Sequence, residues 1–317
     1  MNEQLKNILN KYGSLKEPFL FVISYDLKEF YVKPLKDLPS DIKYEIKDKS
    51  FSKIINKTQL KKYPISFHEY KKSFDFIQEQ IKAGNSYLLN LTFQTKIDIN
   101  LSLDEIYEKA NARYKLKFFD NFVCFSPEKF IEIKKNKIYT YPMKGTINAN
   151  LPNAQAKVLA DTKEMAEHTM VVDLLRNDLA IVSKKVRVDK FRYIDKINAG
   201  NKKLLQVSSK ISGELEKNWH EKIGDIISSI LPAGSITGTP KRKTLEILKE
   251  IEDYDRGYYT GVFGVFDGES LNSAVMIRFI EKNQKNELFY KSGGGITSDS
   301  NVSLEYQELI DKIYLPF

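Results

Sequence analysis

The chain has 317 residues, of which 42% are hydrophobic and 29% charged, and its formal net charge at pH 7 is +8. This composition is typical of a soluble globular protein with a substantial core, and no run of about 18 apolar residues predicts a membrane span. The lysines are scattered and zinc-finger and RNP-type signatures are absent, so we expect neither a nucleic-acid nor a membrane partner.

The first part of the chain contains few candidate functional side chains. Residues 1–13 have the periodicity of an amphipathic helix and lack the apolar segment of a signal peptide. Residues 19–25 and 30–32 predict a strand pair around a short turn. Residues 33–62 are rich in lysine, and we expect turns there rather than regular structure.

Regular elements are predicted again from residue 67 onward. Residues 67–83 show helical periodicity that stops at Gly84, and residues 86–93 predict a buried strand. Cys124, the only cysteine, lies among aromatic and aliphatic residues, which predicts a buried thiol without a catalytic role. A single cysteine also excludes an internal disulfide and favours a reducing, cytoplasmic location.

Two polar residues in the middle of the chain occur where the local sequence constrains the backbone. Glu128 follows Ser126-Pro127 in a turn before a predicted strand. Lys144 lies between Pro142-Met143 and Gly145, in an otherwise apolar frame. Most lysines are solvated surface residues. A lysine fixed in such a frame would be desolvated, however, and a depressed pKa would make its amine a nucleophile or a base.

The C-terminal third combines a predicted loop, a predicted hairpin and a glycine cluster. Residues 232–241 form a loop rich in glycine and proline that leads into an amphipathic helix. Residues 261–266 and 274–280 predict two strands joined at Asp267-Gly268. A turn is predicted at Gly293-Gly294-Gly295, where backbone N–H groups can approach an anionic ligand without interference from Cβ atoms.

Two predicted helices each present a pair of glutamates on one face. Glu164 and Glu167 lie on a helix over residues 161–180, and Glu305 and Glu308 lie on the last helix, residues 304–313. One such pair commonly does no more than complement the helix dipole. If both pairs converge, a hard cation is needed between them, and Mg²⁺ prefers oxygen ligands of this kind.

Several motifs occur in a fixed order over roughly residues 67–312. They are Phe125-Ser126-Pro127-Glu128, Pro142-Met143-Lys144-Gly145-Thr146, Ala166-Glu167-His168, Asp173-Leu174-Leu175-Arg176-Asn177-Asp178-Leu179, Pro232-Ala233-Gly234-Ser235-Ile236-Thr237-Gly238 and Gly293-Gly294-Gly295-Ile296. In these motifs the chain resembles the chorismate-utilising enzymes, and most closely aminodeoxychorismate synthase component I. Anthranilate synthase component I and the isochorismate and salicylate synthases belong to the same family.

The resemblance implies a reaction through the residue at position 144. Anthranilate and salicylate synthases generally carry alanine there, whereas aminodeoxychorismate synthases carry lysine, as this chain does. Lys144 would then attack C2 of chorismate while Glu128 protonates the departing C4 hydroxyl. Ammonia would add at C4 and expel the lysine, giving 4-amino-4-deoxychorismate, a precursor of 4-aminobenzoate and folate.

The resemblance also implies the other site residues, the fold and the partners. Mg²⁺ would be held by Glu167 and Glu308, with Glu164 and Glu305 as further or water-mediated partners. The residues implied to bind substrate are Arg278, Tyr259, Gly293, Gly294, Gly295, Thr146, Ser235 and Lys312. The fold implied is α+β, with two packed antiparallel sheets and outer helices. A short N-terminal segment, residues 1–66, would pack on a catalytic domain, residues 67–317, within one structural domain.

The chain departs from the family pattern at several points. Gln206 occupies a position where the family usually has histidine, and no glutaminase module is present. Ammonia would therefore come from a separate glutamine amidotransferase subunit or from solution. Anthranilate synthase is the alternative within the family. Outside enzymes, the alternatives are a non-catalytic chorismate-binding regulatory subunit and a basic nucleic-acid-binding protein.

Overall fold

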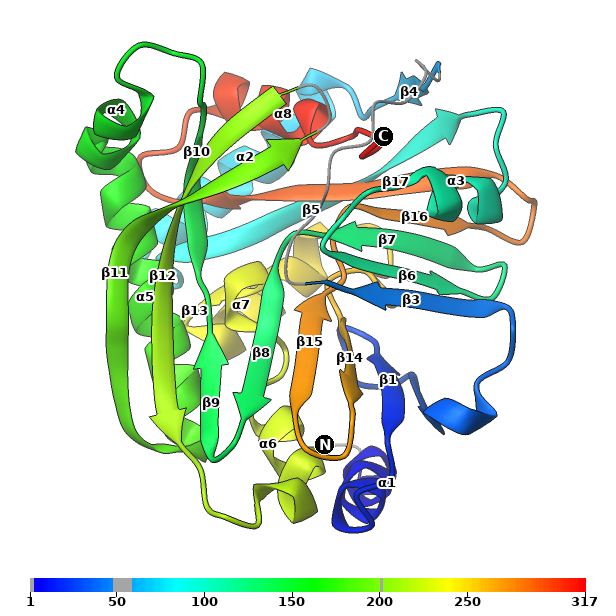
Figure 1. The fold of residues 1–317 in the computed structure, drawn as a ribbon. Helices are drawn as coiled ribbons and strands as arrows, with labels where there is room; N and C mark the ends of the chain where they lie inside the picture. Colours follow the sequence, from blue (N-terminus) through cyan, green and yellow to red (C-terminus); the bar gives the residue numbers. More distant parts are fainter. Residues whose placement is uncertain (1–2, 48–58, 200–201) are drawn as a thin grey trace.

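Two antiparallel sheets pack against each other in the computed structural model, which describes residues 3–47, 59–199 and 202–317. Figure 1 shows the strands of one sheet running across the direction of the other, with helices on the outer sides. The expected α+β fold of two packed antiparallel sheets with outer helices is confirmed. Within the described ranges, no helix is long and apolar enough to cross a membrane.

The first sheet has nine strands in the described part of the chain, in the order β10-β12-β9-β8-β15-β14-β1-β2, with β11 paired to β12. Its strands are β1 (Phe19–Ile23), β2 (Phe30–Pro34), β8 (Lys129–Lys134), β9 (Lys137–Thr140), β10 (Met143–Asn148), β11 (Lys184–Ala199), β12 (Lys202–Glu214), β14 (Val262–Phe266) and β15 (Leu271–Val275).

The second sheet has eight strands among the described residues, in the order β13-β5-β17-β16-β7-β6-β3, with β4 paired to β5. Its strands are β3 (Ile42–Ile46), β4 (Lys61–Tyr63), β5 (Leu88–Asp98), β6 (Tyr114–Phe118), β7 (Phe122–Ser126), β13 (Gly238–Thr239), β16 (Phe279–Lys282) and β17 (Leu288–Ile296).

The helices pack on the outer faces of the two sheets (Figure 1). The α-helices are α1 (Glu3–Ser14), α2 (Phe67–Lys82), α3 (Leu103–Lys109), α4 (Ala154–Ala160), α5 (Thr162–Val182), α6 (Ile223–Ile230), α7 (Lys241–Ile251) and α8 (Val302–Asp311). Single 3₁₀ turns are η1 (Leu35–Asp37), η2 (Trp219–Lys222) and η3 (Gly234–Ile236).

Apolar side chains fill the space between the sheets and the space under the helices. Phe263 of β14, Phe122 of β7 and Phe279 of β16 belong to one buried cluster, which joins the two sheets face to face. A second cluster lies between the first sheet and helices α1, α5 and α6. A third packs α2, α7 and α8 on β5 and β17. Cys124 is fully buried in the cluster between the sheets, as predicted.

Elements with strong local signals form where the sequence predicts them. Ser66 caps α2 through a reciprocal pair of hydrogen bonds with Glu69, and Gly84, with a φ of +75°, follows its end. Asp161 caps α5 by accepting a hydrogen bond from the Glu164 N–H at 2.9 Å. The hairpin turn predicted at Asp267-Gly268 joins β14 to β15.

Three sequence expectations are wrong. Residues 33–62 are not only turns, because they contain β3 and the start of β4; residues 48–58 of this segment lie outside the described residues. The predicted strand over residues 274–280 is divided, since β15 ends in one sheet and β16 begins in the other. The three glycines predicted as a turn lie in β17, where Gly293 pairs with Thr92 of β5.

Candidate functional site

Two of the connections that lead from one sheet to the other each carry a predicted site residue. Glu128 lies between β7 and β8, and Arg278 lies between β15 and β16 with a φ of +53°. The crossings are tied together by two backbone hydrogen bonds. The N–H of Phe125 donates to the Arg278 carbonyl at 3.1 Å, and the N–H of Val275 donates to the Glu128 carbonyl at 3.2 Å.

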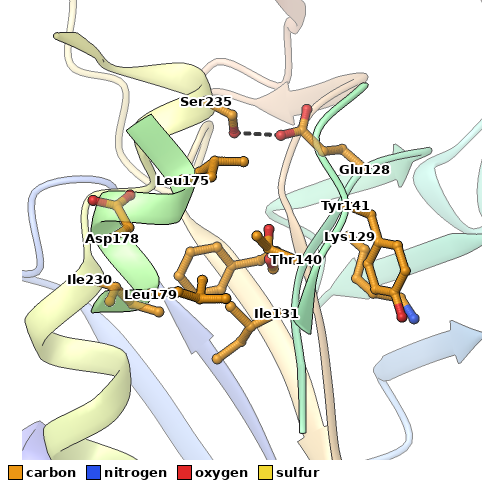
Figure 2. A pocket seen from close by; sticks show the side chains of 11 residues that line it. Glu128, Lys129, Ile131, Thr140, Tyr141, Leu175, Asp178, Leu179, Ile230 and Ser235 are labelled. Carbon is orange, nitrogen blue, oxygen red and sulfur yellow. Dashed lines mark hydrogen bonds between the residues drawn. The ribbon is translucent and has the colours of Figure 1, made fainter. Parts of the chain in front are cut away.

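Glu128 is held by a hydroxyl from the glycine-rich loop. Ser235 in η3 donates a hydrogen bond from its Oγ to Oε1 of Glu128 (Figure 2). Burial raises the pKa of the Glu128 carboxyl above its ordinary value, and the Ser235 hydrogen bond and the positive charges of Arg278, Lys312 and Lys144 oppose this rise without cancelling it. A carboxyl with a raised pKa is suited to donate a proton.

Lys144 is presented by an irregular strand. The pairing of β10 with β12 shifts register between Met143 and Thr146, and Gly145 within this bulge has a φ of +83°. Nζ of Lys144 lies 2.5 Å from Oε2 of Glu167 on α5.

The expectation of a depressed pKa at Lys144 is wrong for this arrangement. Burial lowers the pKa of the amine, but the negative charges of Glu167, Glu308 and Glu164 outweigh burial and raise the pKa above its ordinary value. The frame around Lys144 is therefore acidic, not apolar, because α5 brings its glutamates to β10. The sequence next to Lys144 contains no sign of these neighbours.

The four predicted metal-binding glutamates come from α5 and α8, and lysines lie among them. Lys163, four residues before Glu167, places its Nζ 3.8 Å from Oε1 of Glu167 and 3.4 Å from Oε1 of Glu305. This ammonium group therefore links the two helices. Glu308, which is more exposed, pairs with Lys312 at 2.7 Å. Burial alone would raise the pKa of Glu308, yet the neighbouring lysines lower it.

The donor chemistry of this group fits a hard divalent cation. Carboxylate oxygens are the ligands that Mg²⁺ prefers. Oε2 of Glu164 is buried with no hydrogen-bond partner among the described residues, and burial raises the pKa of this carboxyl. Across residues 3–47, 59–199 and 202–317, no three Asp, Glu, His or Cys side chains are already arranged around a common metal position. The ammonium groups of Lys144 and Lys163 neutralise Glu167 in its present position.

The glycines of β17 face the charged groups from the side of the second sheet. A methyl group added at Gly294 would lie 3.7 Å from both Oε2 of Glu305 and Nζ of Lys312. One added at Gly295 would lie 3.6 Å from Nζ of Lys144. Lys312 also donates a hydrogen bond to the Gly293 carbonyl at 2.8 Å. A strand without side chains therefore forms one wall of the site and leaves space beside the lysines.

The remaining predicted residues Arg278, Tyr259 and Thr146 differ in burial and in their contacts. The guanidinium of Arg278 lies 5.4 Å from the ring centre of Tyr314, and its charge opposes the rise in the pKa of Glu128 that burial causes. Tyr259 is buried, and its ring lies 5.8 Å from that of Phe279. Thr146 is exposed on β10 opposite Gln206 of β12.

Sequence reasoning missed several residues that support the site. Lys163 is recognisable only by its i, i+4 spacing from Glu167. His168 is fully buried, and its Nε2 lies 2.7 Å from Oγ of Ser209 on β12; burial lowers its pKa to about 4, so the ring is neutral. Asp178, which lies in the motif over residues 173–179, forms an ion pair at 2.7 Å with Lys241, which follows the motif over residues 232–238.

Comparison with known proteins identifies the family. The sequence profile of chorismate binding enzymes matches residues 16–316. The chain belongs to this family. The uncharacterized PabA-like protein of Haemophilus influenzae is 49% identical over 97% of this chain and 94% of its own length. Aminodeoxychorismate synthase component 1 of Bacillus subtilis is 31% identical over 79% of this chain, which spans 55% of that relative.

A solved structure supports the fold of this chorismate binding enzyme. The menaquinone-specific isochorismate synthase of Escherichia coli superposes with a TM-score of 0.73, over 98% of this chain and 80% of that one, at 15% sequence identity. At this identity the likeness concerns the fold alone. Family membership therefore supports an enzyme that acts on chorismate, and the choice of reaction depends on the residues of the site.

Proposed function

We propose that this chorismate binding enzyme adds ammonia to C4 of chorismate and forms 4-amino-4-deoxychorismate, for 4-aminobenzoate and folate biosynthesis. The observation that carries the proposal is a lysine at position 144, placed between the β17 glycines and Glu167, whose positive charge partly offsets the rise in the pKa of Glu128 that burial causes. A nucleophile and an acid within electrostatic range of each other suit a substitution that proceeds in two displacements.

In the first displacement, the Lys144 amine forms a bond to C2 of the ring. The ring double bonds shift, and the bond from C4 to its hydroxyl breaks. Glu128 gives its proton to the departing oxygen, which leaves as water. In the second displacement, ammonia forms a bond to C4, the double bonds return, and the bond from C2 to Lys144 breaks. The nitrogen added at C4 gives up its extra proton, and Glu128 is reprotonated before the next turnover.

Lys144 must lose its proton before it can attack. In the present arrangement Glu167, 2.5 Å away, keeps the amine protonated. If another cation neutralised the charge of Glu167, the pKa of Lys144 would fall, because burial is the largest effect on this amine and favours its neutral form.

We propose that Glu167 and Glu308, assisted by Glu164 and Glu305, hold Mg²⁺. The bound ion would supply a positive charge for the ring carboxylate of chorismate. Lys163 already occupies part of this space as a cation between α5 and α8. The side chains of Lys163 and Lys144 would therefore move away from Glu167 when the metal binds.

The second carboxylate of chorismate, on the enolpyruvyl group, is assigned to the cationic side of the site. Arg278 is suited to bidentate contact with a carboxylate. Lys312 lies beside Gly293 and Gly294 and adds a second positive charge. We assign Ser235, Thr146 and Tyr259 to the same substrate-binding group.

We propose that ammonia is delivered by a glutamine amidotransferase subunit in the cytoplasm. The chain contains no Cys/His glutaminase pair, since its one cysteine, Cys124, is fully buried and burial raises its pKa. A buried thiol of this kind does not attack glutamine.

Purified protein incubated with chorismate, Mg²⁺ and an ammonium salt tests the proposal. We expect 4-amino-4-deoxychorismate, identified by chromatography and mass spectrometry against anthranilate and isochorismate standards. Formation of anthranilate would assign the chain to the alternative reaction of the family. Unchanged chorismate, in the presence of measurable binding, would indicate a regulatory subunit.

A further inference from the structure

A buried ion pair behind the site has no part in the reaction proposed above. Asp178 on α5 has a side chain only 9% exposed, and its Oδ1 lies 2.7 Å from Nζ of Lys241, the first residue of α7. Lys241 also donates a hydrogen bond to the carbonyl of Ile230, the last residue of α6, at 3.0 Å. The pair therefore joins three helices at one point, next to the loop that carries Ser235.

The same carboxylate fixes the backbone of that loop. The Asp178 carboxylate lies against the backbone of Gly234, and the N–H of Gly234 favours its charged form. A methyl group at Gly234 would lie 2.8 Å from Oδ2 of Asp178, so only glycine allows this approach. Ser235 is the next residue, and its hydroxyl donates to Glu128. An unbroken series of contacts thus runs from Lys241 through Asp178 and the Gly234–Ser235 backbone to Glu128.

The space between these groups is small and mostly apolar. A cavity of about 10 Å³ lies among them, which is about the volume that one water molecule requires. Figure 2 shows Glu128 and Ser235 facing each other at one side of this cavity and Asp178 on α5 at another. Leu175, Leu179 and Ile131 lie between and below them. The cavity holds at most about one water molecule, and the Ser235 hydroxyl is the side-chain group that contacts the Glu128 carboxyl from this side.

We propose that Asp178 and Lys241 are positioning residues for the acid Glu128. Asp178 holds the Gly234–Ser235 turn through the Gly234 N–H, and Lys241 holds Asp178 as a carboxylate, so that the Ser235 hydroxyl keeps Glu128 directed at the C4 oxygen. This inference rests on the proposed function, because it assigns Glu128 the proton that leaves with the hydroxyl.

Removing the charge of Asp178 while keeping the size of its side chain distinguishes a positioning role from a packing role. Burial favours the protonated form of Asp178, and the charge of Lys241 opposes this effect. Asp178→Asn keeps the size of the side chain and removes the ionic attraction. Lys241→Gln removes the same attraction and keeps a donor near the Ile230 carbonyl, so it provides the test if Asp178→Asn does not fold.

A distant ion pair of the same construction provides the control. Lys115 of β6 is buried, pairs with Glu45 of β3 at 2.9 Å and donates to the carbonyls of Tyr107 and Ala110. Glu45→Gln therefore removes one half of a comparable pair at the far edge of the second sheet. We expect this variant to retain wild-type kcat, with melting temperature reporting the cost of losing a buried charge in each case.

The inference is tested by measuring kcat and KM for amination with Asp178→Asn in the wild-type background and in the Ser235→Ala background. We expect Asp178→Asn to lower kcat about tenfold and to change KM for chorismate by less than about threefold, since a misplaced acid loses part of its catalytic contribution. In the Ser235→Ala background the same change should cause no further loss, because the series of contacts is already broken.

Two results would overturn the inference: a folded Asp178→Asn or Lys241→Gln enzyme with wild-type kcat, or losses that multiply with that of Ser235→Ala. Failure of the wild-type enzyme to form the aminated product would instead remove the proposed function itself.

Discussion

Alanine at Gly293 and at Gly294 is expected to have different effects, although the two glycines are adjacent in β17. A methyl group at Gly293 would lie 2.6 Å from the Leu91 carbonyl oxygen and from Cγ2 of Thr92, both on the paired strand β5. A carbonyl oxygen within a sheet cannot move aside, so Gly293→Ala should cost about 1–3 kcal/mol. At Gly294 the nearest atoms are 3.7 Å away, an ordinary contact distance.

Thermal melting and steady-state kinetics of the two variants distinguish these effects. Gly293→Ala should lower the melting temperature by about 2–10 °C. Gly294→Ala should melt within about 2 °C of wild type, yet raise KM for chorismate about tenfold, because its methyl group enters the space between Glu305 and Lys312. Wild-type melting of Gly293→Ala would refute the close packing of β17 on β5, and a wild-type KM for Gly294→Ala would refute the assignment of β17 as the wall of the substrate site.

Three further predictions concern single carboxyl groups. Glu128→Gln should lower kcat by at least about 10² while leaving chorismate affinity, measured by calorimetry, within a few-fold of wild type. Chelation with EDTA should abolish amination and added Mg²⁺ restore it, and Glu164→Gln should weaken Mg²⁺ binding in a titration without substrate. Burial raises the pKa of Glu132, but Lys129 and Lys134 outweigh burial and lower it to about 2. A carboxyl whose pKa is depressed in the folded state stabilises the protein at pH values above its unfolded-state pKa, and this contribution is lost as the pH falls through its folded-state pKa. Glu132→Gln should therefore reduce the free energy of unfolding by at most about 3 kcal/mol at pH 7 and by almost nothing near pH 2. Urea unfolding at the two pH values measures both changes.

Local signals in the sequence were sufficient for the elements whose ends they determine. The capping pair of Ser66 and Glu69 and the glycine after α2 lie next to the helix they bound. The division of residues 274–280 is different in kind. It depends on a crossing between sheets at Arg278, whose positive φ is imposed by pairing with distant strands. The apolar run over residues 274–277 resumes at Phe279 directly after Arg278 and gives no sign of the crossing.

The candidate site shows the same limit. Helical spacing predicted that Glu164 shares a face with Glu167, and Glu305 with Glu308, because that relation is local. Contacts between elements were not predictable in the same way. Lys144 was expected in an apolar frame, and the structure pairs it with Glu167 from another element. The glycines were expected in a turn because nothing in their sequence indicates that β5 lies beside them.

The product formed by Lys144→Arg, compared with wild type, tests the central claim most directly. Arginine retains the positive charge that faces Glu167, but its guanidinium stays protonated and cannot attack C2. With chorismate, Mg²⁺ and ammonium, we predict 4-amino-4-deoxychorismate from the wild-type enzyme and none from Lys144→Arg, while chorismate binding persists. An undiminished rate of amination by the folded variant would contradict the covalent role of Lys144.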